Sequence, residues 1–131
     1  MTVEKKKILV AEDNQVMADV VRFNLERVGY DVTVTNSGQE VLDQLAVQQF
    51  DLLLTDFQMP EVNGDELCQK ILGDERHTEM KIVMCSAKGY ELNVDQLQRE
   101  LNIYRIIFKP FSPVQMKLIV AEALEIQTVA S

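Results

Sequence analysis

Short apolar runs separated by longer amphipathic stretches recur along the whole chain. The runs at 8–11, 52–55 and 82–85 are almost continuously apolar, which is typical of strands covered on both faces. Residues 32–35 instead alternate apolar and polar side chains, as expected of a half-exposed strand at the edge of a sheet. The sequence therefore predicts strands at 8–11, 32–35, 52–55, 82–85 and 103–108.

Apolar residues spaced by three and four follow each strand and predict amphipathic helices. Start and stop signals mark several of these helices: capping side chains, a proline suited to the first helical position, and a terminating glycine. In chain order the signals are Gly29, Ser37-Gly38-Gln39-Glu40, Asn63 with Glu66, and Ser112-Pro113. The residues expected to face inward are Met17, Val20, Val21, Leu25 and Val28; Val41, Leu42 and Leu45; Leu67, Ile71 and Leu72; Leu92, Leu97 and Leu101 in a weaker helix; and Met116, Ile119, Val120 and Ala123.

Regular alternation of strand and helix indicates an α/β fold, a doubly wound parallel sheet with helices on both faces. The edge character of 32–35 favours the flavodoxin-like (βα)5 arrangement, with strand order 2-1-3-4-5. No linker or repeat divides the chain, so we expect one domain over 1–126 and a frayed tail at 127–131.

Composition narrows the function classes. The chain has 131 residues, 47% of them hydrophobic, and a net charge of −8, which argues against a nucleic-acid-binding surface. No apolar run approaches the ~18 residues of a membrane span, and no secretion signal is evident at the N-terminus. Cys68 and Cys85 have no metal-ligand spacing and are predicted to be small buried residues in a reducing cytosol. His77 lies in a polar stretch and is predicted to be exposed.

Charged or hydroxyl side chains stand where four of the predicted strands end. Glu12-Asp13 follow the first strand, Asp56 the third, Ser86 the fourth and Lys109 the fifth. Because the carboxyl ends of parallel strands face one crevice, these side chains should converge although they are distant in sequence. Three carboxylates and a lysine in one crevice predict a site for a divalent metal ion and a phosphoryl group.

These positions carry a family resemblance that covers nearly the whole chain. The chain resembles the receiver domain of two-component response regulators, the phosphoacceptor module of bacterial signalling. The matching motifs are Glu12-Asp13; Asp56 with Met59-Pro60 and Gly64; Ser86-Ala87; and Lys109-Pro110-Phe111. Each motif alone is weak, since acids at a helix start or a surface lysine are common, but all four in order at strand ends are specific.

The resemblance implies that Asp56 is the nucleophile and takes a phosphoryl group from a histidine kinase or a histidine phosphotransfer protein. It implies a Mg2+ ion bound directly by Asp13 and Asp56, through water by Glu12, and by the backbone carbonyl of Gln58. Oxygen ligands with several retained waters suit Mg2+.

The resemblance gives Lys109 and Ser86 the role of binding phosphoryl oxygens, and it implies a cis bond between Lys109 and Pro110. It also implies a cytoplasmic signalling protein that is not a conventional enzyme, with an unknown downstream effector and a possible homodimer on phosphorylation. From the net charge and the lack of a long apolar run, we also expect no direct binding of nucleic acid and no membrane insertion.

One position departs from the usual receiver pattern. Three residues before the lysine, receivers commonly have a Tyr or Phe whose ring moves inward on activation, and here the residue is Ile106. Regular strand alternation would place Tyr104 and Phe108 on the face of Ile106, where an aromatic ring could partly substitute.

Two alternatives come from other functional classes. A flavin-binding electron carrier can share this strand order, but its first strand should enter a hydroxyl- and glycine-rich phosphate loop, and Glu12-Asp13-Asn14 would repel a phosphate. A receiver-like interaction module that no longer takes phosphate would be expected to lack some of the site residues, and all are present.

Overall fold

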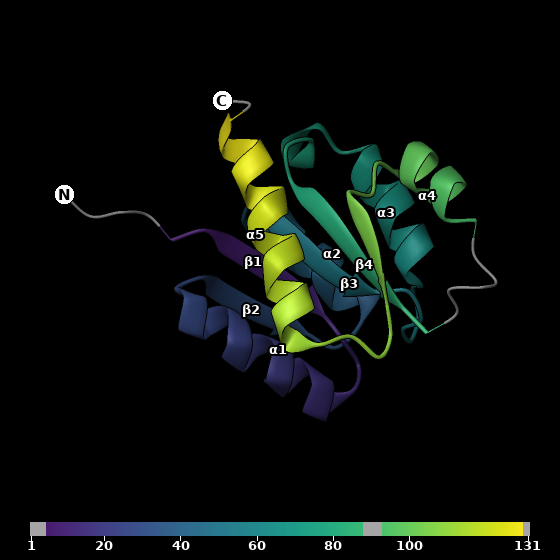
Figure 1. Cartoon of the computed structure of the whole chain (residues 1–131). Coiled ribbons are helices and arrows are strands. Elements are labelled where there is room, and N and C mark those ends of the chain that lie inside the picture. The colour runs from purple at the N-terminus through teal and green to yellow at the C-terminus, as the bar shows by residue number, and fades with distance from the viewer. Residues whose placement is uncertain (1–4, 88–92, 130–131) are drawn as a thin grey trace.

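The computed structural model of the protein describes residues 5–87 and 93–129. Its strands form one parallel sheet in the order β2-β1-β3-β4-β5, which confirms the flavodoxin-like α/β fold (Figure 1). The strands are β1 (Lys7–Ala11), β2 (Asp31–Thr35), β3 (Leu52–Asp56), β4 (Lys81–Ser86) and β5 (Arg105–Phe108). The helices are α1 (Gln15–Val28), α2 (Gly38–Val47), α3 (Gly64–Leu72), the 3-10 turn η1 (Glu75–His77), α4 (Val94–Leu101) and α5 (Pro113–Val129).

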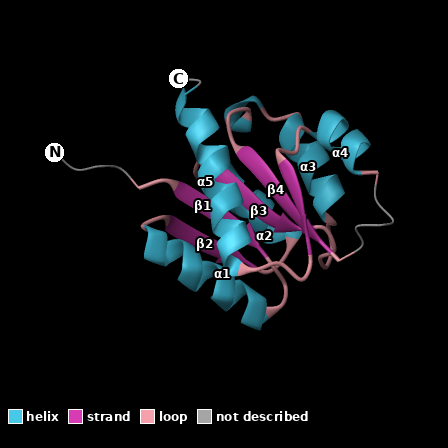
Figure 2. Cartoon of the chain, viewed as in Figure 1, coloured by secondary structure: helices cyan, strands magenta, loops and turns pink. Residues whose placement is uncertain are grey.

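The sheet separates two hydrophobic clusters, one under α1 and α5 and the other under α2, α3 and α4 (Figure 2). Along β3 every residue is buried, and successive side chains enter opposite clusters: Leu53 contacts one and Leu54 the other. This explains the continuous apolar run of a central strand. Among the described residues, no helix is both long and apolar enough to cross a bilayer.

Because the strands are parallel, their carboxyl-terminal ends all lie at the same end of the sheet. Ala11, the last residue of β1, pairs with Thr55 of β3, and Asp56 pairs with Cys85 of β4. On the far side, Ser86 pairs with Phe108, the last residue of β5. The residues that follow these strands therefore start from neighbouring positions.

Most helix ends agree with the sequence signals. Gly29 ends α1 in the left-handed region, at φ 114°, which suits a residue without a Cβ. Ser37 caps α2 by accepting the N–H of Glu40 at 3.2 Å, and Ser112 caps α5 by accepting the N–H of Gln115 at 3.0 Å. Asn63 occupies the N-cap position of α3 without a side-chain cap bond; its Oδ1 accepts the N–H of Met59 at 3.5 Å instead.

The inward face of α1 differs from the prediction. Its buried residues are Ala18, Val21 and Leu25, whereas Val20 and Val28 are exposed. The small Ala18 supplies an inward position that a search for large apolar residues overlooks. The inward face of α1 is therefore rotated relative to the predicted face, and part of the predicted face is exposed to solvent.

The third, fourth and last helices follow their predictions in part. In α3, Leu67 and Ile71 are buried as expected, whereas Leu72 is exposed. Leu97 packs against the core and Leu101 is buried, whereas Leu92 lies outside the described residues. The four inward residues expected of α5 are all buried. The backbone of α5 is helical as far as Val129, beyond the expected domain end at 126, and the frayed tail at 127–131 stays a prediction.

The expectation that His77 is exposed was wrong, because the residue is only 5% exposed. The polar stretch around it folds into η1, whose N-cap Asp74 accepts the N–H of Arg76. This turn places the imidazole Nε2 at 2.9 Å from the carbonyl oxygen of Leu45 in the last turn of α2. Carbonyl groups there lack intrahelical donors, so the ring is used as a buried cap.

The sequence predicted that Tyr104 and Phe108 both lie on the face of Ile106, and this is correct for Phe108 only. Ile106 is buried in the cluster beneath α4, but Tyr104 precedes β5 and packs against the opposite cluster. Phe108 shares the face of Ile106 by register and is 42% exposed. Of the two rings, only Phe108 lies on the face of Ile106.

Candidate functional site

An open pocket lies over the carboxyl-terminal ends of β1, β3, β4 and β5. It contains every residue expected to bind the metal ion or the phosphoryl group, including Gln58. Its lining is Glu12, Asp13, Asn14, Asp56, Phe57, Gln58, Ser86, Ala87 and Lys109. The sheet thus brings together four sequence segments that are distant along the chain.

The turn from β1 to α1 holds the acidic pair. The backbone N–H of Glu12 donates to the carbonyl oxygen of Thr35 on the edge strand at 3.1 Å. Its side-chain Oε2 accepts the N–H of Asn14 at 3.1 Å, and Asn14 in turn caps α1. Glu12 is buried by these contacts, whereas Asp13 is exposed.

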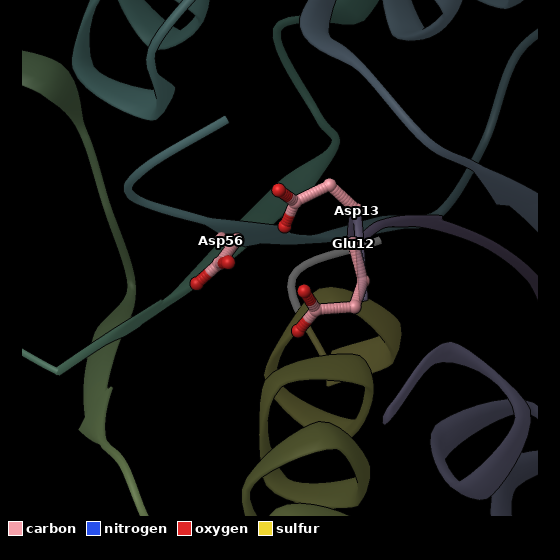
Figure 3. A group of neighbouring side chains, drawn as sticks. All are labelled: Glu12, Asp13 and Asp56. Carbon is pink, nitrogen blue, oxygen red and sulfur yellow. The ribbon is translucent and has the colours of Figure 1, made fainter. Parts of the chain in front are cut away.

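Glu12, Asp13 and Asp56 form a cluster that could hold a metal ion. One carboxylate oxygen from each lies within 4.8 Å of the others. Figure 3 shows Glu12 and Asp13 extending from the end of β1 on the side where Asp56 stands. Hard oxygen donors, one exposed and two buried, fit a divalent cation that keeps part of its water shell.

Lys109 joins two of these carboxylates. Its Nζ lies 2.9 Å from Asp56 Oδ1 and 3.0 Å from Glu12 Oε1. The backbone N–H of Lys109 donates to the carbonyl oxygen of Ser86 at 2.8 Å, which ties the end of β5 to β4. The Lys109-Pro110 bond is cis, as the resemblance implied.

Burial and charge alter the proton affinity of the central groups. Burial raises the pKa of Asp56 to about 6; the hydrogen bond from Lys109 opposes this rise, and the charge of Glu12 adds to it. Burial acts against the charge of Lys109, but hydrogen bonds to Asp56 and Glu12 outweigh it, so the pKa of the ammonium is raised. The site is therefore an acidic crevice with one firmly protonated cation.

The segment after Asp56 is fixed from several directions. The N–H of Phe57 donates to the carbonyl oxygen of Cys85 at 2.8 Å, and its own carbonyl accepts the N–H of Gly64 at 2.7 Å. The side chain of Met59 is buried beneath the segment. These contacts set the path of the backbone that carries Gln58 past the acidic cluster.

Ser86 ends β4 next to the pocket and is buried. Both cysteines are buried as predicted, and burial raises the pKa of the Cys68 and Cys85 thiols to about 12. Thiols that hold their protons at neutral pH are poor nucleophiles, so Cys85 contributes bulk beneath the site.

Two supporting residues were not predicted from the sequence to act in the site. Asn14 lines the pocket and caps α1, and its position directly after two acids at a strand end was an available signal. Thr35 fixes the backbone of Glu12 from the neighbouring strand and donates its hydroxyl to the carbonyl oxygen of Val10. Its contribution depends on the β1–β2 register, which the sequence alone does not specify.

Comparisons with known proteins agree with this geometry. Residues 8–121 match the family model of the response regulator receiver domain. The alkaline phosphatase synthesis transcriptional regulatory protein PhoP of Bacillus subtilis (strain 168) is 34% identical over 108 residues. That match covers 82% of this chain and 44% of PhoP, so the chain spans less than half of this relative.

Solved structures show the same fold. A CheY-like response regulator receiver domain protein from Methanospirillum hungatei JF-1 superposes with a TM-score of 0.88 at 24% identity, covering 98% of this chain and 100% of the other. The chemotaxis response regulator CheY4 of Vibrio cholerae gives a TM-score of 0.84 at 20% identity, covering 92% and 99%. The receiver domain of the Francisella response regulator 1452 gives 0.83 at 26% identity, covering 92% and 98%.

Proposed function

The chain belongs to the response regulator receiver domain family of two-component signalling, and on this premise we propose that Asp56 is its phosphoacceptor. The observation that carries the proposal is the position of Asp56, at the centre of an acidic pocket and in contact with Lys109 at 2.9 Å. A receiver domain is a signalling phosphoacceptor and not a classical enzyme, so the reaction modifies the protein itself.

The proposed donor is a phosphohistidine on a histidine kinase or a histidine phosphotransfer protein. A carboxylate oxygen of Asp56 forms a bond to phosphorus while the phosphorus–nitrogen bond breaks, and the electron pair of that bond leaves with the imidazole. Such a transfer demands mainly alignment and neutralisation of charge from the protein. Burial of Asp56 at the end of β3 fixes the direction from which the donor approaches.

Lys109 and Ser86 are proposed to receive the phosphoryl oxygens. The ammonium of Lys109 already contacts Asp56, so it lies beside the atom that gains the new charge. A lysine acts there as a compact point charge with several donors. Ser86 brings a hydroxyl group from the end of β4, on the opposite side of Asp56 from the acidic pair.

The acidic cluster is proposed to bind Mg2+. Asp13 and Asp56 would be direct ligands, the backbone carbonyl of Gln58 would add an oxygen, and Glu12 would act through water. When bound, Mg2+ would offset the repulsion between the carboxylates and an anionic phosphoryl group.

Signalling requires partners beyond the donor. We propose a cytoplasmic protein whose phosphorylated form engages a downstream effector domain or protein, with homodimer formation as one route. The match to PhoP, a transcriptional regulatory protein, covers only 44% of that relative, so its regulatory output is not transferred to this chain.

A phosphorylation experiment tests the proposal. With Mg2+ and acetyl phosphate, intact mass should show one added phosphoryl group that hydroxylamine removes. Asp56→Asn should show none, and the matched control Asp31→Asn, exposed at the opposite end of the sheet, should be labelled like the native chain. Equal labelling of Asp56→Asn would refute the assignment, and no labelling of any form would favour a receiver-like module that takes no phosphate.

The flavin alternative has little support from the pocket. Glu12, Asp13 and Asp56 line the crevice where a flavin phosphate would have to lie, and their carboxylates would repel it. An absorption spectrum of the purified protein near 450 nm, where bound flavins absorb, distinguishes the two functions.

A further inference from the structure

Another pocket lies at the end of the sheet opposite the acidic crevice, between the last turns of α3 and α4 and the start of β4. Its floor is formed by buried residues: Ile71, His77, Met80, Ile82 and Leu101. Its mouth is formed by exposed residues: Leu72, Thr78 and Asn102. The lining that the structure describes contains no Lys, Arg, Asp or Glu, so the pocket suits an uncharged and mainly apolar ligand.

The pocket is small and open on one side. Its volume is about 70 Å³, less than half of the roughly 150 Å³ of an apolar cavity known to bind benzene. Leu72 at the mouth is 50% exposed, so a ligand seated in the pocket would cover apolar surface that now faces water. The fitting ligand is therefore a single small ring or a short chain, part of which stays at the mouth.

The imidazole of His77 gives the floor one polar group. Its Nε2 lies 2.9 Å from the carbonyl oxygen of Leu45 and 4.0 Å from Asp74 Oδ2. Both oxygens are acceptors, so Nε2 carries the N–H, and in the neutral ring Nδ1 then offers a lone pair. Nδ1 is buried and has no hydrogen-bond partner among the described residues. A buried acceptor in this state costs free energy, which a ligand that donates to it would recover.

The ring is turned so that this acceptor borders the pocket. Nε2 points toward Leu45, which is not one of the pocket's lining residues, and the two ring nitrogens point in widely different directions. Nδ1 therefore lies on the side of the ring away from Leu45. Because Nδ1 is covered by its neighbours, a ligand reaches it after a small rotation of side chains, which is common on binding.

We propose that this pocket binds a small neutral ligand with an apolar ring and one N–H or O–H donor, and that His77 Nδ1 accepts the hydrogen bond from that donor. The ligand would join α3 to α4 at the end of β4 that is remote from Ser86. The inference does not depend on the phosphoacceptor role of Asp56, and its tests need neither a metal ion nor a phosphodonor.

Two ring compounds of nearly the same shape test the ligand class. Pyrrole carries an N–H donor and thiophene carries none. In an NMR titration of the native chain, both should shift the methyl resonances of Ile71, Leu72 and Leu101, and pyrrole should bind about threefold or more tighter. Equal affinities would overturn the hydrogen bond, and unchanged methyl resonances with both compounds would overturn the pocket as a binding site.

The nitrogen resonances of His77 identify the acceptor. The Nδ1 resonance should move to lower frequency with pyrrole and change little with thiophene, while Nε2 keeps its proton for Leu45. An unchanged Nδ1 resonance with pyrrole would assign the donor to Thr78 or Asn102 and overturn the role of His77. An Nδ1 already hydrogen-bonded before any ligand is added would show that water satisfies it, and this would also overturn the proposal.

A matched pair of variants locates the binding. Leu72→Ala removes an exposed apolar side chain from the mouth and should weaken the binding of both compounds by about threefold. Leu118→Ala makes the same change at a residue that is 65% exposed on α5, against the other face of the sheet, and should leave both affinities unchanged. Equal effects of the two changes would place the compounds elsewhere and overturn the site.

His77→Phe separates the shape of the pocket from its polar group. The variant keeps an aromatic ring in the floor but has no nitrogen, so thiophene should still bind and the preference for pyrrole should disappear. A preference that persists in the variant would overturn the assignment of His77 as the acceptor. If the loss of the contact with Leu45 prevents the variant from folding, the Nδ1 resonance of the native chain decides the same point.

Discussion

The N–H of Gly64 donates to the carbonyl oxygen of Phe57 at 2.7 Å, so the first residue of α3 lies against the segment that follows the acceptor. A Cβ on Gly64 would lie 2.6 Å from the carbonyl oxygen of Asp56 and 3.0 Å from the Cα of Phe57. Both are backbone atoms that cannot turn aside as a flexible side chain could. The close approach therefore requires glycine at this position.

We expect Gly64→Ala to lower the free energy of unfolding by about 2 kcal/mol and to weaken Mg2+ binding, because α3 must move away from the segment carrying Gln58. Urea unfolding and MgCl2 titration measure the two effects. Gly73→Ala is the control: its φ is −82° and the nearest atom to an added Cβ is 3.9 Å away. Similar losses in both variants would show that the contact with Asp56 is not the cause.

The protonation of Asp56 should make the stability of the protein depend on pH. Burial raises the pKa of Asp56 from 3.8 to about 6, so the folded protein holds this proton more tightly than the unfolded chain. The resulting stabilisation is complete below about pH 4 and is lost as the pH rises through about 6. At neutral pH the charged acceptor therefore reduces the free energy of unfolding.

Asp56→Asn should consequently be more stable than the native chain at pH 7.5, by about 1–2 kcal/mol after allowance for solvent screening. The difference should shrink toward pH 4, where the native carboxyl is protonated. Thermal unfolding of both chains across this range measures it. A difference that does not change with pH would show that Asp56 titrates alike in the folded and unfolded states.

His77 should contribute to stability through Leu45. His77→Ala removes a buried ring and leaves the carbonyl oxygen of Leu45 without its donor, and we expect a loss of about 2–4 kcal/mol. His77→Gln should lose less, because its amide N–H can reach the same oxygen.

The control for His77 is its neighbour Arg76, whose ion pair with Asp74 is exposed, so Arg76→Ala should leave the free energy of unfolding nearly unchanged. Urea unfolding of the three variants ranks their free energies of unfolding. If glutamine and alanine cost the same, the hydrogen bond to Leu45 contributes nothing measurable.

The response to phosphate should be concentrated after β4. Ile106 is already buried beneath α4, and its branched side chain has a stiff χ1, so it cannot make a large movement from solvent into the core. With beryllofluoride as a phosphoryl mimic, amide exchange should slow mainly over residues 86–92, of which the structure describes Ser86 and Ala87.

Strong new protection over residues 104–108 would contradict this expectation. Phe108 would then be the first residue to test, because it pairs with Ser86 on the face of Ile106 and is partly exposed. Loss of that protection in Phe108→Val, with retention in Tyr104→Val, would identify its ring as the coupling element.

The parts of the fold predicted from sequence are those where one local pattern determines the outcome. The continuous apolar run of β3 requires cover on both faces, and parallel strands then bring Asp56 and Lys109 to the same edge. Local patterns did not predict the burial of a residue that contacts partners distant in the sequence. His77 was judged by its polar neighbours, but a carbonyl thirty-two positions away determines its burial.

A similar limit applies to finer contacts of the site. Asn63 has the sequence signature of a helix cap, yet its side chain bonds Met59 instead because the segment after Asp56 folds back over it. The face of Tyr104 could not be derived from strand alternation because the strand begins only at Arg105.

The direction of the elements has a practical consequence for attaching the protein to other objects. β1 begins at Lys7, at the end of the sheet opposite the acidic pocket. The last helix, α5, runs antiparallel to the strands and ends at Val129 on the same side as Lys7 (Figure 1). A chip surface, fluorophore or fusion partner joined at either of these ends would stand away from Asp56. Immobilised protein should therefore remain open to a phosphodonor, which suits binding assays in which the partner is supplied from solution.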